Sequence, residues 1–192
     1  MRPSHRWEIV QLLAILFACS LWVAGAAASQ PSPLALGDTL PALEGKVLSG
    51  RAISLPDSTR TSAALLLLGF TYESRHDVEA WAERFRRDFA ADSGIRCYEV
   101  PVIGGAARLA RPFIDRGMRR GTPRDLHDRV ITVYGGSKQW KRRVRYSTPD
   151  AAYVLLVDRV GRLVWRARGP FDEEAFRALA ARIRQLRYGS PR

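Results

Sequence analysis

The side chains best suited to chemistry gather directly after one apolar run. Residues 63–70 read AALLLLGF, and the polar stretch TYESRHD follows them. Ser74 and His76 could act as nucleophile and base, and Glu73, His76 and Asp77 offer ligand types that bind copper or zinc. Neighbouring loop positions seldom meet productively, and no Gly-x-Ser-x-Gly turn surrounds Ser74. Capping of a following helix by Ser74 or Asp77 is the simpler expectation.

The second chemical candidate is a single thiol. The chain has two cysteines, and Cys19 falls in the apolar N-terminal stretch, so Cys97 alone remains for the rest of the protein. Cys97 lies in IRCYEVPVI, where strand alternation puts it on one face with Ile95 and Glu99. We expect a small buried hydrophobe, because a reactive thiol needs exposure and a neighbour that stabilises the thiolate. A peroxidase or thiol sensor that uses Cys97 is the alternative.

A third candidate is a cationic surface. The segment SKQWKRRVRY predicts a short helix capped by Ser137. Trp140 and Val144 are four residues apart, so one face can pack while the cations spread over the others. The candidate contacts for a partner or for lipid headgroups are Lys138, Trp140, Lys141, Arg142, Arg143 and Arg145. A second basic stretch could extend this surface: Arg108, Arg111, Arg116, Arg119 and Arg120.

The N-terminal residues predict an exported protein. Arg2 and Arg6 precede an apolar stretch that closes with small residues near Ala28. This layout is typical of a cleaved secretory signal over residues 1–28, and an uncleaved membrane anchor or a lipoprotein modified at Cys19 are the alternatives. Each places the remaining chain in the bacterial envelope, either periplasmic or anchored to the outer face of the inner membrane.

Charge narrows the expected partners. The chain carries 31 Lys and Arg against 19 Asp and Glu, a formal net charge of +12. This excess favours an anionic membrane surface or an acidic protein complex. An exported protein rarely meets nucleic acid, so no nucleic-acid partner is expected.

Neither glycine pair, at 104–105 or 135–136, precedes the Lys-Ser/Thr of a phosphate loop. No cofactor or metal is expected.

The apolar periodicity predicts the elements that position these residues. Residues 29–41 are rich in proline and small residues and predict a linker, so the folded domain is expected over 42–192. We expect first a hairpin with turns at Gly45 and Gly50, a buried strand at 63–70, and a helix from Asp77 that ends before Gly94. A strand at 95–103 follows, and then a helix at 106–120 with Leu109, Phe113 and Met118 on one side. The last expected elements are a strand at 129–134, the basic helix, a hairpin around 159–161 and a helix capped by Asp172.

This order predicts an α/β fold. A β-α-β unit with parallel pairing precedes an antiparallel β-β-α unit. Such a chain forms a three-layer α/β/α domain around a mixed central sheet.

The expected plan resembles the thioredoxin superfamily. The best match is YVLLVDRVGRLVWRARG, a hairpin with Asp158 and Gly161 in its turn. Redox members of that superfamily carry a Cys-x-x-Cys pair after the first buried strand. The resemblance places Arg75 and Val78 at those positions, and shifted frames place Glu73 or Ser74 there. No frame supplies a thiol.

A second superfamily feature is also missing. Redox thioredoxins keep a proline six residues before the turn aspartate of the hairpin. Ala152 stands at that position here, and Pro149 lies three residues too early. Both features that shape a dithiol site are therefore absent from the sequence.

Within the superfamily, the chain is most similar to the ATP synthase assembly factor ten family. The similarity rests on Trp81 and Phe85 in DVEAWAERF, on AYVLLVD, and on RLVWRARG before an acidic helix start. The resemblance implies a redox-inactive binding protein that assists assembly or maintenance of a membrane protein complex and is not an enzyme. The alternative is an exported thiol-dependent oxidoreductase or peroxiredoxin-like protein that uses Cys97. Metal delivery through the His76 loop is a third possibility.

Overall fold

The computed structural model describes residues 31–188, of which residues 32–188 belong to one compact unit. The expected signal or anchor at residues 1–28, with Cys19, lies outside the described residues. Within residues 31–188, no helix is both long enough and apolar enough to cross a bilayer.

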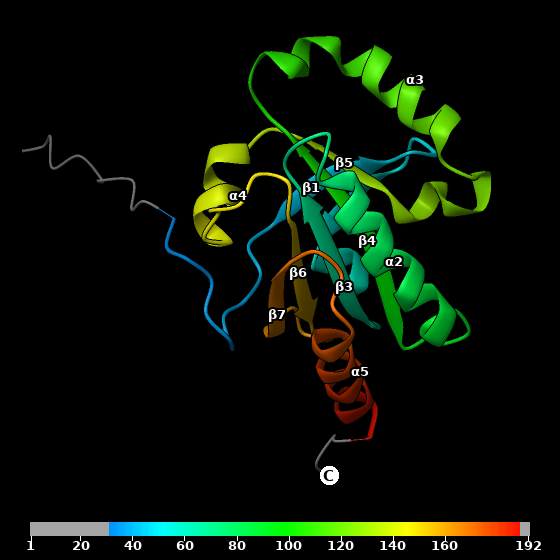
Figure 1. The fold of residues 1–192 in the computed structure, drawn as a ribbon, viewed down its shortest axis with the longest axis vertical. Helices are drawn as coiled ribbons and strands as arrows, with labels where there is room; N and C mark the ends of the chain where they lie inside the picture. The colour runs from blue at the N-terminus through cyan, green and yellow to red at the C-terminus, as the bar shows by residue number, and fades with distance from the viewer. Residues whose placement is uncertain (1–30, 189–192) are drawn as a thin grey trace, which may run out of the picture. The chain divides into compact units, whose positions relative to one another are not determined.

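One mixed sheet runs through the domain in the strand order β2-β1-β5-β4-β3-β6-β7 (Figure 1). The strands are β1 (Leu43–Val47), β2 (Ala52–Leu55), β3 (Ala63–Gly69), β4 (Ile95–Ile103), β5 (Ile131–Tyr134), β6 (Ala152–Val157) and β7 (Leu163–Gly169). β3, β4 and β5 pair in parallel, and the remaining neighbours pair antiparallel. The predicted mixed central sheet is confirmed.

Helices follow most of these strands. The α-helices are α2 (Arg75–Phe89), α3 (Arg111–Gly121), α4 (Ser137–Arg143) and α5 (Glu173–Tyr188), and short 3-10 helices form η1 (Asp57–Thr59), η2 (Gly105–Ala110) and η3 (Arg124–Arg129). α2 and α5 cover one face of the sheet, and α4 packs on the other. This arrangement confirms the predicted α/β/α layers.

The core divides along β3, whose seven residues are all buried. Leu65 and Leu67 pack with Trp81 of α2 and Phe176 of α5. Leu66 lies in a second buried cluster on the opposite face. A strand buried on both faces has no polar alternation, which is why the continuous leucine run predicts it.

The expected turn at Gly45 is wrong. Gly45 lies inside β1, and a Cβ there would stand 2.6 Å from Cγ2 of Ile131 on β5. Glycine is needed for the close approach of two strands, not for a turn. Gly50 does form the turn, with a φ of +103°.

The expected helix over 106–120 differs from the structure in two ways. It divides into η2 and α3, and its apolar side does not pack inward. Leu109 is 89% exposed and Phe113 is 77% exposed, while Met118 is half-buried. An apolar stripe at helical spacing predicts a face that can be covered, but it does not say that this chain covers it.

Part of the expected linker belongs to the folded domain. Leu34 and Leu40 are buried, and Leu34 N–H donates to Arg143 O at 2.9 Å. Gly37 N–H also donates to Leu163 O at 2.8 Å. The described chain is therefore fixed to the domain from about residue 34 onward.

Two local predictions near the C-terminus are confirmed. Asp158 Oδ1 accepts the N–H groups of Val160 and Arg162 at 3.0 and 2.8 Å, which closes the β6–β7 turn. Asp172 Oδ2 accepts the N–H of Ala175 at 2.6 Å, so it caps α5 as expected.

Candidate functional site

The loop after β3 is closed by its own hydrogen bonds. Ser74 Oγ donates to Thr71 O at 2.7 Å, and Ser74 N–H donates to Thr71 Oγ1 at 3.1 Å. Ser74 is only 1% exposed, and a Cβ on Gly69 would lie 2.6 Å from Ser74 Oγ. Ser74 stands at the N-cap of α2, but its side chain makes no capping hydrogen bond. Its hydroxyl stabilises the loop and is not available as a nucleophile.

The tip of this loop carries the exposed groups. Tyr72 is 73% exposed, and the Arg75 guanidinium lies 3.8 Å from its ring centroid. Arg75 Nη2 lies 3.3 Å from His76 Nε2, which lies 3.8 Å from a carboxylate oxygen of Glu73. α2 begins at Arg75, two residues before the expected start at Asp77.

The loop does not form a catalytic or metal-binding set. Val78, one of the two positions at which the resemblance expects cysteine, is 6% exposed and packs in the core under α2. Among residues 31–188, no three His, Cys, Asp or Glu side chains are arranged to hold a metal ion. The Glu73–His76–Asp77 set is therefore not assembled.

The loop is joined to the segment that precedes β6. Thr71 Oγ1 lies 2.9 Å from Asp150 Oδ1 and 3.3 Å from Pro149 O. These contacts connect residues about eighty positions apart in the chain, at the end of the sheet where β3 finishes. In open α/β sheets, the carboxyl ends of parallel strands are the usual place for ligand binding.

An aromatic cluster links this loop to α4. The Phe70 ring lies edge-on to Tyr146 and Tyr153, with centroids 5.3 and 5.5 Å apart. Lys141 Nζ lies 4.1 Å from the Tyr146 ring centroid and 5.8 Å from that of Phe70. Tyr153 Oη accepts the backbone N–H of Ser147 at 2.9 Å, which holds the segment after α4. The structure thus brings together the loop and the basic helix, which the sequence alone did not place together.

The predicted cationic contacts of α4 divide into two groups. Lys138, Arg142 and Arg145 are exposed, and Lys141 and Arg143 are half-buried. Trp140 is 3% exposed and lies in the core, so it supports α4 and does not contact a partner. The Arg143 guanidinium lies 5.2 Å from the Trp140 ring centroid, and partial burial lowers the pKa of Arg143.

The ends of α4 differ from the expected capping. Ser137 is the first helical residue, and Gly136, at a φ of +62°, is the N-cap. At the other end, Tyr146 N–H donates to Lys141 O and Arg145 N–H donates to Arg142 O. This is a Schellman ending in which Arg145, at a φ of +55°, occupies the position that favours glycine. Arg145 thus holds a strained backbone beside the aromatic cluster.

Cys97 lies in the middle of the sheet. It pairs with Leu65 across β3 and β4 and is 8% exposed. Burial and the carboxylate of Glu99 raise the pKa of the Cys97 thiol, and Arg86 offsets only part of that rise. The expectation of a buried thiol is confirmed, and a protonated thiol at neutral pH is a poor nucleophile.

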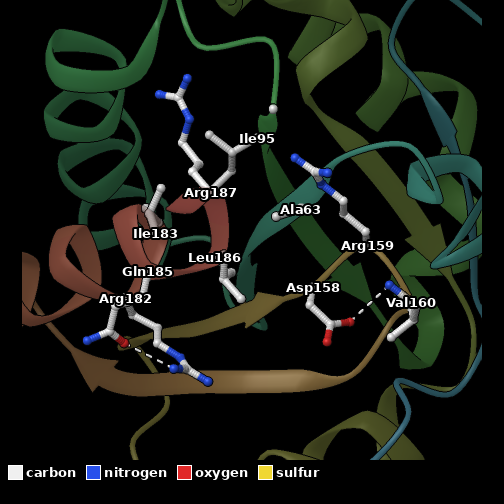
Figure 2. A pocket seen from close by; sticks show the side chains of 11 residues that line it. Ala63, Ile95, Asp158, Arg159, Val160, Arg182, Ile183, Gln185, Leu186 and Arg187 are labelled. Carbon is white, nitrogen blue, oxygen red and sulfur yellow. Dashed lines mark hydrogen bonds between the residues drawn. The ribbon is translucent and has the colours of Figure 1, made fainter. Parts of the chain in front are cut away.

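A cavity of about 360 Å³ lies at the opposite end of the sheet, where β3 and β4 begin (Figure 2). Its wall includes three arginines, which do not converge on one point: Arg159, Arg182 and Arg187. Arg187 Nη1 donates to Asp92 at 2.7 Å, and Arg182 Nη1 donates to Gln185 at 3.0 Å. The cavity contains none of the predicted site residues.

Comparison with solved structures establishes the fold. The thioredoxin domain of a thiol-disulfide oxidoreductase from Bacteroides vulgatus matches with 17% identity over 78% of this chain and 99% of that chain, at a TM-score of 0.51. BsSco, a member of the Sco family of cytochrome c oxidase assembly proteins, matches with 13% identity over 80% and 96%, at a TM-score of 0.55. A thiol peroxidase from Chromobacterium violaceum matches with 14% identity over 80% and 90%, at a TM-score of 0.52.

The chain has a thioredoxin-like fold, as the sequence resemblance implied. No protein-family model matches the chain, and no curated protein matches it in sequence. At these identities the likeness concerns the fold alone, so function has to be argued from the site.

Proposed function

We propose that this protein works by binding, and that its client contacts one surface at the end of β3. We call this the loop–α4 surface; it consists of Tyr72, Glu73, Arg75, His76, Lys138, Lys141 and Arg145. The observation that carries the proposal is the closed Thr71–Ser74 loop. Where redox relatives would present a thiol, this chain buries a serine and exposes Tyr72, with the half-buried Arg75 against its ring.

The composition of this surface suits protein recognition. Tyrosine and arginine are enriched among the residues that dominate binding energy in interfaces. The loop is held by hydrogen bonds to Thr71, and α4 is anchored by the buried Trp140. Rigid presentation lowers the entropy lost on association.

The client we propose is a membrane protein complex in the bacterial envelope, which the chain helps to assemble or maintain. Three observations support this proposal. The N-terminal residues have the layout of an export signal or anchor, the sequence resembles the assembly factor ten family, and BsSco belongs to a family of oxidase assembly proteins with the same fold. The surplus of cations favours an acidic face on the client.

Thiol chemistry at Cys97 is the second candidate. The similar proteins favour thiol chemistry over an assembly role, because they include a thiol-disulfide oxidoreductase and a thiol peroxidase. The geometry of Cys97 favours it less, since the thiol is buried and its pKa is raised. Such a function requires an opening that carries α2 or β3 away from Cys97.

Site-specific photo-cross-linking tests the binding proposal. A photoreactive phenylalanine analogue replaces Tyr72 in the full chain, and the matched control carries it at Val160 in the β6–β7 turn. The two side chains are similarly exposed, at 73% and 69%. We expect one envelope membrane complex to cross-link at Tyr72 and not at Val160. Equal products at both positions, or none at Tyr72, contradict the proposed surface.

A further inference from the structure

The segment between β4 and β5 leaves an apolar and cationic face without a partner in the domain. Every residue from 104 to 129 is described, and none of them is buried. Half-buried residues recur at helical spacing on the side of α3 that faces the domain: Arg111, Ile114, Asp115 and Met118. Tyr134 Oη donates to Asp115 at 2.8 Å on that side.

The outward side of this segment has a different composition. We call it the α3 face and define it by Phe113, Arg116, Gly117 and Arg120 of α3, together with Leu109 near the end of the preceding 3-10 helix η2; all five are exposed. Leu109 is 89% exposed and Phe113 is 77% exposed. Within residues 105–121 there are five arginines and one acid, Asp115, which is held by Tyr134 and lies 3.7 Å from Arg111. The face therefore presents two apolar side chains among cations.

From this arrangement we infer that the α3 face binds the surface of an anionic lipid bilayer. Helices that lie at a bilayer interface insert Phe and Leu below the headgroups while Lys and Arg contact the phosphates. Each cation near such a surface contributes attraction, and each apolar side chain that leaves water adds to it. An acidic protein would attract the arginines but would also need a groove for two separated apolar side chains.

The α3 face lies where contact with a membrane would also place the loop–α4 surface near that membrane. α3, the β3–α2 loop and α4 lie along the same end of the sheet (Figure 1). A Cβ on Gly104, just before η2, would lie 2.7 Å from Cβ of Ser137, so this segment starts against the first residue of α4. Contact of the α3 face with lipid would thus hold the loop–α4 surface close to a membrane.

Vesicle binding tests the inference with the compact unit that starts at Ser32, which contains both buried clusters. Mixed phosphatidylglycerol and phosphatidylcholine vesicles are compared with vesicles of phosphatidylcholine alone in co-sedimentation. We expect binding to the anionic vesicles only. Arg116→Ser with Arg120→Ser should weaken the partition about thirtyfold, and Phe113→Ser about tenfold. Circular dichroism confirms that each variant remains folded.

The matched control removes the same charge elsewhere. Arg96 and Arg159 are exposed at the opposite end of the sheet, so Arg96→Ser with Arg159→Ser should leave vesicle binding nearly unchanged. An equal loss in this control would mean that net charge alone drives binding and would overturn the inference. Absence of binding to the anionic vesicles would overturn it as well.

A fluorophore placed on the α3 face separates lipid from an acidic protein. In the unit that starts at Ser32, Leu109→Cys is labelled with an environment-sensitive dye, and Cys97→Ala removes the other thiol. Its emission should shift to the blue with anionic vesicles, because the dye enters the apolar layer. It should not shift with polyglutamate. An equal shift with polyglutamate would assign the face to an acidic protein and contradict a lipid contact.

Discussion

Two connections leave the same end of the sheet and differ in almost every physical respect. The connection from β3 to α2 is closed by Thr71 and Ser74, and the helix that follows buries Trp81 and Phe85. The connection from β4 to β5 buries no residue between positions 104 and 129, all of them described. Its contacts with the domain include polar ones, such as that of Arg119 Nη1, which donates to Leu48 O at 3.5 Å.

The connection from β3 to α2 can stay rigid, whereas the connection from β4 to β5 can open locally. A segment with few buried apolar contacts opens locally at low free energy, whereas a segment that belongs to the core opens only with the whole domain. The loop–α4 surface, supported by Trp140 and the aromatic cluster, suits a specific protein contact. The α3 face suits a deformable lipid surface. Four measurements test this difference between the two connections.

The largest expected contrast is in thiol labelling. Two forms of the unit that starts at Ser32 are compared. In the first, Cys97 is the single thiol and is buried. In the second, Leu109→Cys combined with Cys97→Ala places the single thiol on the α3 face. Labelling of Cys97 at neutral pH should be slower by about a thousandfold or more, since it requires opening of the core. Stopped-flow and mass spectrometry measure the two rates. Comparable rates would remove the contrast and favour a thiol function at Cys97.

The next contrast is in the free energy of unfolding. Trp81→Ala should lower it by about 3–5 kcal/mol, because a large side chain in the core is replaced by a cavity. Phe113→Ala, an aromatic deletion of similar kind on the α3 face, should change it by less than about 0.5 kcal/mol. Urea denaturation measures both. A loss of several kcal/mol for Phe113→Ala would mean that this segment packs on the domain.

A smaller loss in the free energy of unfolding is expected when the Ser74 hydroxyl is removed. Ser74→Ala leaves Thr71 O and Thr71 N–H without their side-chain partner and should cost about 1–3 kcal/mol. Ser93→Ala is the matched control, because Ser93 is exposed, and it should be nearly neutral. Equal stability of the two variants would contradict the structural role assigned to Ser74.

The smallest expected effect is a rise in the free energy of unfolding instead of a fall. Arg145→Gly should raise the free energy of unfolding by up to about 1 kcal/mol, because glycine adopts the left-handed conformation at the end of α4 without strain. The same change should weaken the Tyr72 cross-link, since it removes a cation from the loop–α4 surface. Arg142→Gly is the control, and it should destabilise α4 because position 142 is inside the helix. A loss of stability in Arg145→Gly would contradict the assigned strain.

The parts of the fold that the sequence predicted are those set by local chemistry. The leucine run of β3, the Asp158 turn and the Asp172 cap each follow from a few neighbouring residues. The α/β order and the mixed sheet follow from the alternation of such elements. The burial of Cys97 follows from its place in a central strand.

The parts that the sequence could not predict depend on contacts between distant segments. Gly45 serves the approach of β1 to β5, and Ser137 lies beside Gly104 instead of capping α4. The meeting of the loop with α4 depends on Phe70 and Tyr146, which are far apart in the chain. The exposure of Leu109 depends on the absence of any covering element in the described domain, and helical spacing does not report that.

We infer that this thioredoxin-like protein acts through the loop–α4 surface and not through a thiol. The most direct test is to repeat the Tyr72 cross-link in a full chain that carries Cys97→Ala, and therefore no thiol after the N-terminal segment. We expect the same membrane complex to cross-link in the same yield. Loss of the cross-link in a chain that circular dichroism shows to be folded would contradict it and would assign the function to Cys97.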